Sequence, residues 1–284
     1  MSKIAILCIC TGRYAVFWDK FYHSFEQNFL PQSEKHYFIF SDDKKLCELG
    51  NPKVHVSYLE SEPWPLGTLL KYHRFLTLEH ELCKYDYIYQ TNINMECIEQ
   101  VKEEEFLPQE TDKPLFFTRH YGYHNTRKCY YPYDRNRKCL AYIPYNRGQI
   151  YVYGAMNGGC AKEYILFMKE LDDRILLDLA HGVIAKWHDE SHVNHYVASH
   201  KDYKILPSDY CYPEGEGMPR DTRIMAIDKK NFFDVSTFKN GGEETQNKIT
   251  LLYRIKCKLG PMSKTFLTNI MYCRDCVLGR KIID

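Results

Sequence analysis

Short, continuous apolar runs alternate with longer segments of helical periodicity through the first part of the chain. KIAILCIC, residues 3–10, is apolar almost throughout, as expected for a strand that is buried on both faces of a parallel sheet. Residues 14–29 instead carry apolar side chains at helical spacing. The same patterns predict further strands at 36–42, 85–92 and 113–120 and further helices at 68–83, 161–187 and 188–200. This alternation predicts an α/β fold with a Rossmann-like half.

Polar residues stand directly after several of the predicted strands. Thr11, Asn92, Asn94 and His120 all follow such a strand. Ligands of open α/β sheets bind beyond the carboxyl ends of the strands. The four residues are therefore expected to share one site.

The stretch from His120 to Gly159 is rich in tyrosine and in turn-forming residues, and it predicts loops and short strands that carry a binding surface. Gly154, Gly158 and Gly159 permit close backbone approach before the next helix. They predict either a ligand-binding turn or a tight turn with no ligand.

The sequence WHDES, residues 187–191, gathers an indole, an imidazole and two carboxylates within five residues. Trp187 could stack on a sugar while Asp189 and Glu190 bind hydroxyls or supply a nucleophile. The alternative is an exposed helix start, where acidic side chains favour the helix dipole.

Composition narrows the class of protein. The chain has 284 residues, a formal charge of +1 and 15% aromatic residues, so it predicts a folded protein without a nucleic-acid partner. The cysteines are scattered and several lie in apolar segments, which favours a reduced compartment. With no signal peptide and no apolar span, the expected location is cytoplasmic.

The last part of the chain differs from the rest. Residues 236–284 begin with a polar stretch, and residues 248–284 hold eight Lys or Arg against two Asp, interleaved with apolar side chains. This basic amphipathic tail predicts either a packed helical appendage or peripheral contact with an anionic inner membrane. Its Cys273 and Cys276 form a CxxC that could belong to a thiolate–metal module.

An ordered set of motifs resembles glycosyltransferase family 6, the retaining histo-blood-group A/B and α1,3-galactosyltransferase family. The motifs are DYIYQTNINMECIE, RHYGYH, YDRNRKCLAYIP, YGAMNGGCAKEY and WHDESHVNHY. The resemblance covers about residues 3–230. It implies a GT-A fold with a mixed central sheet, a catalytic domain at 1–235 with donor half 1–110 and acceptor half 111–235, and transfer from a UDP-sugar donor to an oligosaccharide or glycolipid.

The resemblance gives Asn92 and Asn94 a meaning. Vertebrate members carry Asp-x-Asp at this strand end and hold Mn²⁺ there, whereas this chain has neutral amides, which are poorer ligands for hard cations. The chain resembles the bacterial branch with Asn-x-Asn, for which no metal cofactor is expected. Cations that could then offset the charge of the diphosphate are Lys71, Arg135, Lys229 and Lys230.

The family pattern also implies roles for the remaining candidates. Glu190 matches the catalytic carboxylate, either as a nucleophile or as a stabiliser of an oxocarbenium ion. Asp189 would hold donor-sugar hydroxyls, and Asn92 and Asn94 the ribose or phosphate. The uridine is assigned to Thr11 and Tyr14, and the acceptor to His120, Trp187 and Tyr153.

The resemblance also makes Ala155 bear on the choice of donor. Ala155 stands where a Gly makes room for an N-acetyl group in the A-type enzymes of the family and an Ala narrows that space in the B-type enzymes, and one methyl can discriminate by about 1–3 kcal/mol. The resemblance therefore implies α1,3 transfer of galactose from UDP-galactose to a fucosylated β-galactoside. The alternatives are UDP-N-acetylgalactosamine as donor, or a sugar-binding protein that has lost activity.

Overall fold

The computed structural model describes residues 1–62, 64–108, 113–123, 126–215 and 217–235. Its centre is a seven-stranded sheet with the order β3-β2-β1-β4-β7-β6-β8. Apart from β7, which is antiparallel to both of its neighbours, the paired strands are parallel. The strands are β1 (Lys3–Ile9), β2 (Glu34–Ser41), β3 (Val54–Tyr58), β4 (Tyr87–Thr91), β6 (Leu115–Arg119), β7 (Val152–Cys160) and β8 (Tyr203–Leu206).

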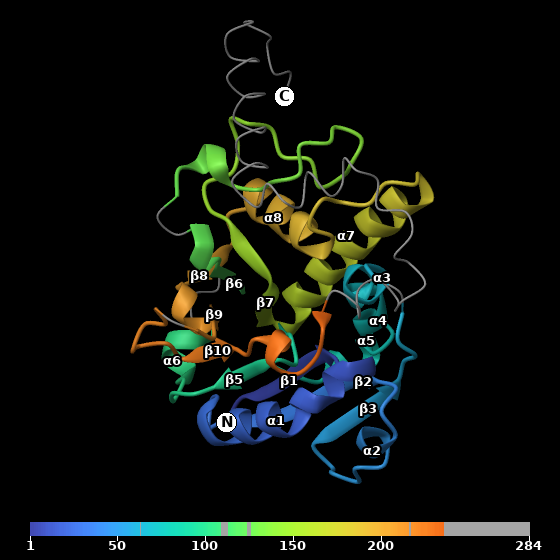
Figure 1. Cartoon of the computed structure of the whole chain (residues 1–284), viewed down its shortest axis with the longest axis vertical. Coiled ribbons are helices and arrows are strands. Elements are labelled where there is room, and N and C mark those ends of the chain that lie inside the picture. The colour runs from blue at the N-terminus through green and yellow to red at the C-terminus, as the bar shows by residue number, and fades with distance from the viewer. Residues whose placement is uncertain (63, 109–112, 124–125, 216, 236–284) are drawn as a thin grey trace, which may run out of the picture.

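Helices cover both faces of this sheet (Figure 1). Alternate residues of β1 point to opposite faces: Ile4 and Ile6 pack with the aromatic side chains of α1, whereas Ala5 and Leu7 pack with residues of α4 and α7. The helices are α1 (Trp18–Asn28), α2 (Lys44–Cys47), α3 (Leu66–Leu69), α4 (Lys71–Leu76), α5 (Glu79–Leu82), α6 (Glu103–Phe106), α7 (Ala161–Ala180) and α8 (Asp189–Ser199).

A second, three-stranded sheet lies beside the central one (Figure 1). Its order is β5-β10-β9, with β5 at Met95–Cys97, β9 at Tyr212–Pro213 and β10 at Ile224–Ala226. This sheet brings the segment after β4 next to residues that come more than 120 positions later in the sequence. The fold is thus the mixed α/β architecture that the sequence predicts.

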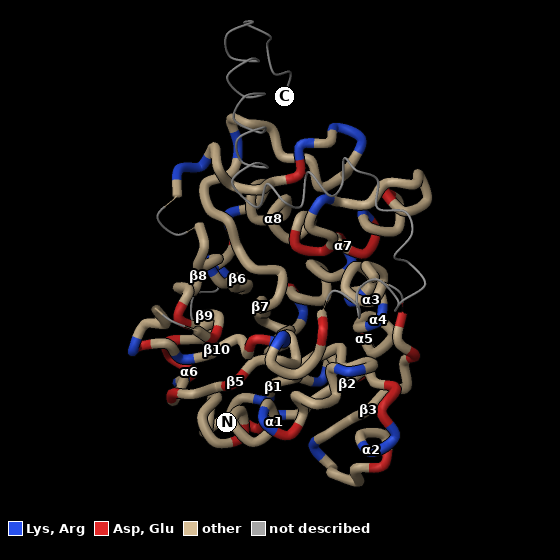
Figure 2. Tube along the Cα trace, in the orientation of Figure 1, with Lys and Arg blue, Asp and Glu red and all other residues tan. Residues whose placement is uncertain are grey.

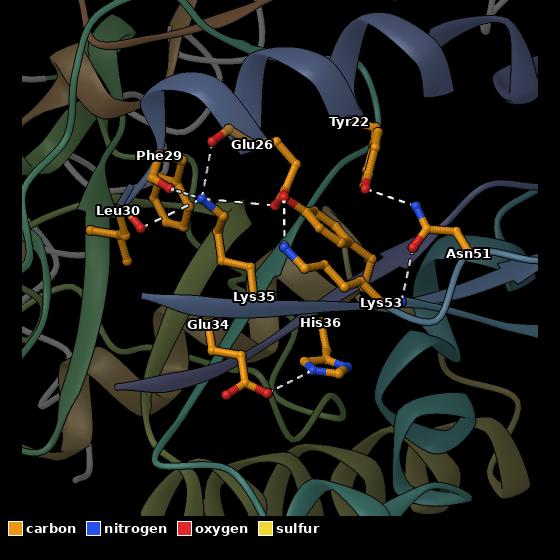
Figure 3. A network of polar contacts seen from close by, with 10 residues as sticks. Tyr22, Glu26, Phe29, Leu30, Glu34, Lys35, His36, Asn51 and Lys53 are labelled. Atoms are coloured by element: carbon orange, nitrogen blue, oxygen red, sulfur yellow. Dashed lines mark hydrogen bonds and ion pairs between the residues drawn. The ribbon is translucent and has the colours of Figure 1, made fainter. Parts of the chain in front are cut away.

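A buried lysine fixes α1 against β2 (Figure 3). Lys35 is only 3% exposed, and its ammonium donates to the carbonyl oxygen of Phe29 at 2.7 Å and to that of Glu26 at 3.3 Å. These carbonyls belong to the C-terminal end of α1, where backbone acceptors have no partner within the helix. The Glu26 carboxylate lies 3.8 Å from the same ammonium. Lys35 therefore acts as a side-chain cap of α1.

Several predicted elements have different limits in the structure. The helix predicted at 68–83 is divided into α3, α4 and α5, and Thr77 donates its hydroxyl to the Arg74 carbonyl near the second break. The helix predicted at 161–187 ends at Ala180, because Gly182 adopts a φ of +68° and stops it. The segment from Gly12 to Phe17 is a 3₁₀ helix that precedes α1.

The prediction of a turn at Gly158 and Gly159 was wrong, because both glycines lie within β7. A Cβ on Gly158 would lie 2.5 Å from the Ile88 carbonyl oxygen, and one on Gly159 would lie 2.4 Å from that of Pro114. Side chains are excluded there by the neighbouring strands. The glycines therefore serve sheet packing rather than a turn.

Charged residues of both signs are interspersed along the described chain (Figure 2). Among the described helices, none is long and apolar enough to cross a membrane. The predicted tail at 236–284, with its proposed membrane contact and its CxxC, lies outside the described residues.

Candidate active site

Asp189 and Glu190 begin α8 directly after a tight turn. The Glu190 amide donates to the Trp187 carbonyl oxygen at 3.0 Å, and His188 between them has φ 54° and ψ −128°. These angles are those of the first central residue of a type II′ turn, a position that glycine normally takes. A histidine there is strained, and such strain costs about 1–3 kcal/mol. The turn aims both carboxylates at β7.

Two hydrogen bonds fix the Glu190 carboxylate. The Tyr151 hydroxyl donates to Oε1 at 2.7 Å, and the Gly154 amide donates to Oε2 at 2.9 Å. Burial raises the pKa of Glu190 to about 7, although both hydrogen bonds oppose the rise. The residue as a whole is half-buried. Glu190 is therefore a desolvated carboxylate that two hydrogen bonds hold in place, the environment of a catalytic group.

Asp189 is buried and its charge is balanced. Its Oδ2 lies 2.7 Å from the Lys71 ammonium, and its Oδ1 accepts from the Thr68 hydroxyl at 3.0 Å. Lys71 also donates to the Gly154 carbonyl oxygen at 2.7 Å. One peptide segment at Gly154 thus contacts Glu190 through its amide and Lys71 through its carbonyl.

Gly154 leaves no space for a side chain. A Cβ at this position would lie 2.8 Å from Glu190 Cβ and 2.9 Å from Asp189 Oδ2. The absence of a side chain allows α8 to approach β7 closely enough for the backbone hydrogen bond to Glu190. The backbone carbonyl oxygen of Ala155, the next residue of β7, accepts a hydrogen bond from the backbone N–H of Asn92 at 3.1 Å. The strand therefore joins the Asn-x-Asn segment to the carboxylates.

Aromatic rings lie beside Glu190. His120 stacks on Tyr153 with ring centroids 4.0 Å apart, and Tyr121 stacks on the same tyrosine at 6.3 Å. Burial lowers the pKa of His120 to about 4, so its imidazole is neutral at neutral pH. Its Nδ1 accepts from the Gly122 amide at 3.1 Å. Trp187 is 37% exposed in the turn before α8. Flat faces of this kind suit sugar rings.

The structure brings Tyr14 and Lys229 together, although they are far apart in the sequence. The Lys229 ammonium lies 3.4 Å from the Tyr14 hydroxyl and 5.3 Å from the centre of its ring. Tyr14 follows β1 and Thr11, whose carbonyl accepts from the Tyr14 amide at 3.3 Å. Burial lowers the pKa of Lys229. Lys230 is exposed beside it.

Asn94 connects the end of β4 to the Lys229 segment. It is 3% exposed, and its side-chain Nδ2 donates to the backbone carbonyl oxygen of Ile227 at 2.9 Å. The backbone N–H of Ile227 in turn donates to the backbone carbonyl oxygen of Asn94 at 2.8 Å. Its Oδ1 is buried without a hydrogen-bond partner. Asn92 is half-buried. The Asn-x-Asn segment is therefore the turn between β4 and β5, and its backbone is tied to β7 at Asn92 and to the residue after β10 at Asn94.

Arg135 is not placed with the carboxylates. Its guanidinium donates to the Ile143 carbonyl and lies over the ring of Tyr145, with Cζ 4.3 Å from the ring centre. Both partners belong to the loop between β6 and β7. The contacts found for Arg135 thus organise this loop.

Three residues of the site escaped the sequence-based prediction: Tyr151, Thr68 and Asn157. Asn157 donates to the Gly154 carbonyl at 3.3 Å and accepts from the Tyr164 hydroxyl at 2.6 Å. Tyr151 is two positions from Tyr153, and Thr68 is one helical turn before Lys71, so spacing alone could have suggested both.

Potential metal ligands occur together once in the residues that the structure describes. Cys139, Asp178 and His192 form that group, which is separate from the Asn-x-Asn segment.

The mixed α/β sheet carries paired carboxylates and aromatic rings at the carboxyl edge of its strands, which is where such sheets bind ligands. The family model described as glycosyltransferase family 6 matches residues 2–235. The chain belongs to this family.

Curated relatives agree with this assignment. The O-antigen biosynthesis glycosyltransferase WbnI of Escherichia coli is 33% identical over 227 residues, which are 80% of this chain and 95% of that protein. The globoside α-1,3-N-acetylgalactosaminyltransferase 1 of Gallus gallus is 27% identical, over 80% of this chain and 67% of that protein. The histo-blood group ABO system transferase 2 of Rattus norvegicus is 28% identical, over 75% and 64%.

Proposed function

We propose that the protein is a retaining transferase that moves galactose from UDP-galactose in α1,3 linkage to a fucosylated β-galactoside, with no divalent metal at the diphosphate. The observation that carries this proposal is the environment of Glu190. Its carboxylate is held by the Tyr151 hydroxyl and the Gly154 amide, and burial raises its pKa to about 7.

Glu190 would act at the anomeric carbon of the donor sugar. Retention of configuration requires either two displacements through a glycosyl–enzyme bond to Glu190 or attack from the leaving-group side within an ion pair. In both cases the carboxylate stabilises the positive charge that develops as UDP departs. The two hydrogen bonds keep the carboxylate in one orientation, so little reorganisation is needed during the reaction.

Asp189 would bind hydroxyl groups of the donor sugar. Its two oxygens already accept from Thr68 and Lys71, but each carboxylate oxygen can accept more than one hydrogen bond. Lys71 then acts through Asp189, since its ammonium is committed to that carboxylate and to the Gly154 carbonyl. Asp189 and Lys71 together form a neutral pair beneath the sugar.

The Asn-x-Asn segment would bind the nucleotide without metal. The unpartnered Oδ1 of Asn94 is a hydrogen-bond acceptor, so it suits a ribose hydroxyl better than a phosphate oxygen. Lys229 lies next to Tyr14, the residue proposed for the uridine, and is therefore the better candidate for the phosphate charge. Tyr153 and His120, which stack on each other, would border the acceptor.

N-acetylgalactosamine is the second candidate for the transferred sugar. The Gallus gallus relative is named as an N-acetylgalactosaminyltransferase. The alanine at position 155 would favour galactose, because the family pattern implies that a methyl group there narrows the space for an N-acetyl group. Separate assays with the two UDP-sugars decide between them.

The test is product formation from each UDP-sugar with 2′-fucosyllactose in excess EDTA. Transfer that persists in EDTA and disappears in Glu190→Gln supports the proposal. Glu104→Gln is the matched control, because Glu104 is an exposed carboxylate on α6. Transfer that stops in EDTA and recovers only with Mn²⁺ would show that the diphosphate needs a metal. Binding of UDP-sugar without any transfer would indicate a sugar-binding protein.

A further inference from the structure

Three buried side chains that can ligate a metal meet at one point outside the site described above. Cys139 belongs to the loop between β6 and β7, Asp178 to the last turn of α7 and His192 to α8. They are 3%, 3% and 1% exposed. One potential ligand atom from each lies within 4.8 Å of the other two.

His192 supplies an independent observation. Both of its ring nitrogens are buried, and neither has a hydrogen-bond partner. Its Nε2 lies 3.6 Å from Asp178 Oδ2, which is longer than a hydrogen bond. Buried polar atoms without partners are rare because they lose their hydration without compensation. The imidazole therefore faces a thiol and a carboxylate without bonding to either.

The separation of the imidazole and the carboxylate fits two ligands of one ion. Around a tetrahedral zinc ion, ligand atoms lie about 3.3–3.8 Å from one another, given metal bonds of about 2.0–2.3 Å. The separation of His192 Nε2 and Asp178 Oδ2 lies in this range. Cys139 Sγ and Asp178 Oδ2 are 3.1 Å apart, as a thiol hydrogen bond, and metal would replace that thiol proton.

Backbone amides already orient the two ligands that would be anionic. The Leu140 amide lies 3.0 Å from both oxygens of Asp178, and the Ala141 amide donates to Cys139 Sγ at 3.4 Å. Such hydrogen bonds from outside the coordination sphere position metal ligands and stabilise their negative charge.

We propose that Cys139, Asp178 and His192 bind a zinc ion that joins the β6–β7 loop to α7 and α8. A thiolate and a carboxylate balance the two charges of Zn²⁺, and a neutral imidazole completes the set, so the complex can be buried without net charge. Water would fill the fourth position. Cys139 gives up one proton when the ion binds.

The ion would support the active site from a distance. His192 lies two residues after Glu190 in α8, and it is not one of the residues that contact Glu190. Anchoring α8 to α7 and to the loop restricts movement of the helix start relative to Gly154. The site is independent of the diphosphate, so transfer in EDTA is compatible with a buried zinc ion, and the proposal does not depend on the proposed reaction.

The experiment has to distinguish this site from the tail cysteines. The full-length chain is prepared with Cys257→Ser, Cys273→Ser and Cys276→Ser together. Its metal content is measured after growth with zinc, and the metal-free form is titrated with Co²⁺, which gives an absorption band when a thiolate binds it. We expect about one equivalent of metal per chain and a thiolate–cobalt band.

Substitutions then locate the ion. Adding Cys139→Ser should remove the band and reduce zinc to below about a tenth of an equivalent, and His192→Gln should do the same. Adding Cys83→Ser, an exposed cysteine, should leave both unchanged. Circular dichroism checks that each variant is folded. No zinc and no cobalt band in the tail-substituted chain would overturn the proposal, and so would a band that survives in folded Cys139→Ser.

Discussion

Gly154→Ala tests whether the position of the Glu190 carboxylate depends on the close contact between β7 and α8 that the absence of a side chain at Gly154 allows. The added Cβ would lie 2.8 Å from Glu190 Cβ and 3.0 Å from Glu190 Cα. The second of these atoms belongs to the backbone, so a rotation of the side chain cannot relieve the contact. The start of α8 has to move away from the strand.

The size of the movement follows from the distances. Ordinary contacts begin at 3.4 Å, so Glu190 Cβ has to retreat by about 0.6 Å. This lengthens the 2.9 Å hydrogen bond from the Gly154 amide. A misplacement of about 1 Å costs on the order of 100-fold in rate, so we expect kcat to fall by about 10- to 100-fold. Overpacking should also lower the free energy of unfolding by about 1–3 kcal/mol.

The assay measures UDP release and product at saturating UDP-sugar, with thermal unfolding in parallel. Gly67→Ala is the matched control, since its added Cβ would meet only the Glu62 carbonyl oxygen at 3.9 Å. We expect this control to keep its kcat. A Gly154→Ala protein that is folded and retains kcat within about twofold of the parent would refute the role assigned to this contact.

Three further predictions concern stability. Lys35→Met should lower the free energy of unfolding, measured with urea, by about 1–3 kcal/mol, because the Phe29 carbonyl loses its donor. Lys53 is an exposed partner of the same Glu26, so Lys53→Met should lower that free energy by less than about 1 kcal/mol. His120 has a pKa of about 4 in the folded protein against 6.5 ordinarily, so the unfolded chain binds more protons between these values. The free energy of unfolding should fall by up to about 3 kcal/mol as the pH drops from 6.5 to 4, and His120→Phe should show a smaller fall. His188→Gly should be more stable than His188→Ala by about 1–2 kcal/mol in thermal unfolding, the reverse of the usual order, because of its positive φ.

The strands that carry continuous apolar runs could be predicted from the sequence, whereas the others could not. β1, β2, β4 and β6 lie within a few residues of their predicted positions. β3 was missed because VHVSY mixes His55 and Ser57 with its valines, as an edge strand allows. β7 was mistaken for a turn because its glycines carry turn chemistry. Their real cause is the close approach of Ile88 in β4 and of Pro114, which directly precedes β6, and such a long-range contact is not contained in the local sequence.

The residues of the candidate active site likewise fall into some that could be predicted from the sequence and others that could not. The predicted pair of Asp189 and Glu190 could be located because the two residues are adjacent in the sequence. Spacing could place their partners Thr68 and Tyr151 near Lys71 and Tyr153, but not in contact with the carboxylates, because those contacts form only once β4 and β7 have paired and α8 has packed on β7. When one site is built from distant segments, the sequence can identify adjacent residues such as Asp189 and Glu190, but it cannot identify the contacts that hold them in place.

The contacts of the cations predicted to offset the diphosphate charge bear most on the proposed reaction. Four cations were predicted to offset the diphosphate, yet Lys71 lies in a buried ion pair with Asp189, and Arg135 bonds within its own loop. A buried carboxylate left without its cation is strongly destabilising, so Lys71 cannot turn to a phosphate without loss at Asp189. Proposed transfer without metal must therefore draw on Lys229 and Lys230, whose segment Asn94 ties to the end of β4. In the proposed reaction, the amide at position 94 would position the segment that carries the replacement charge.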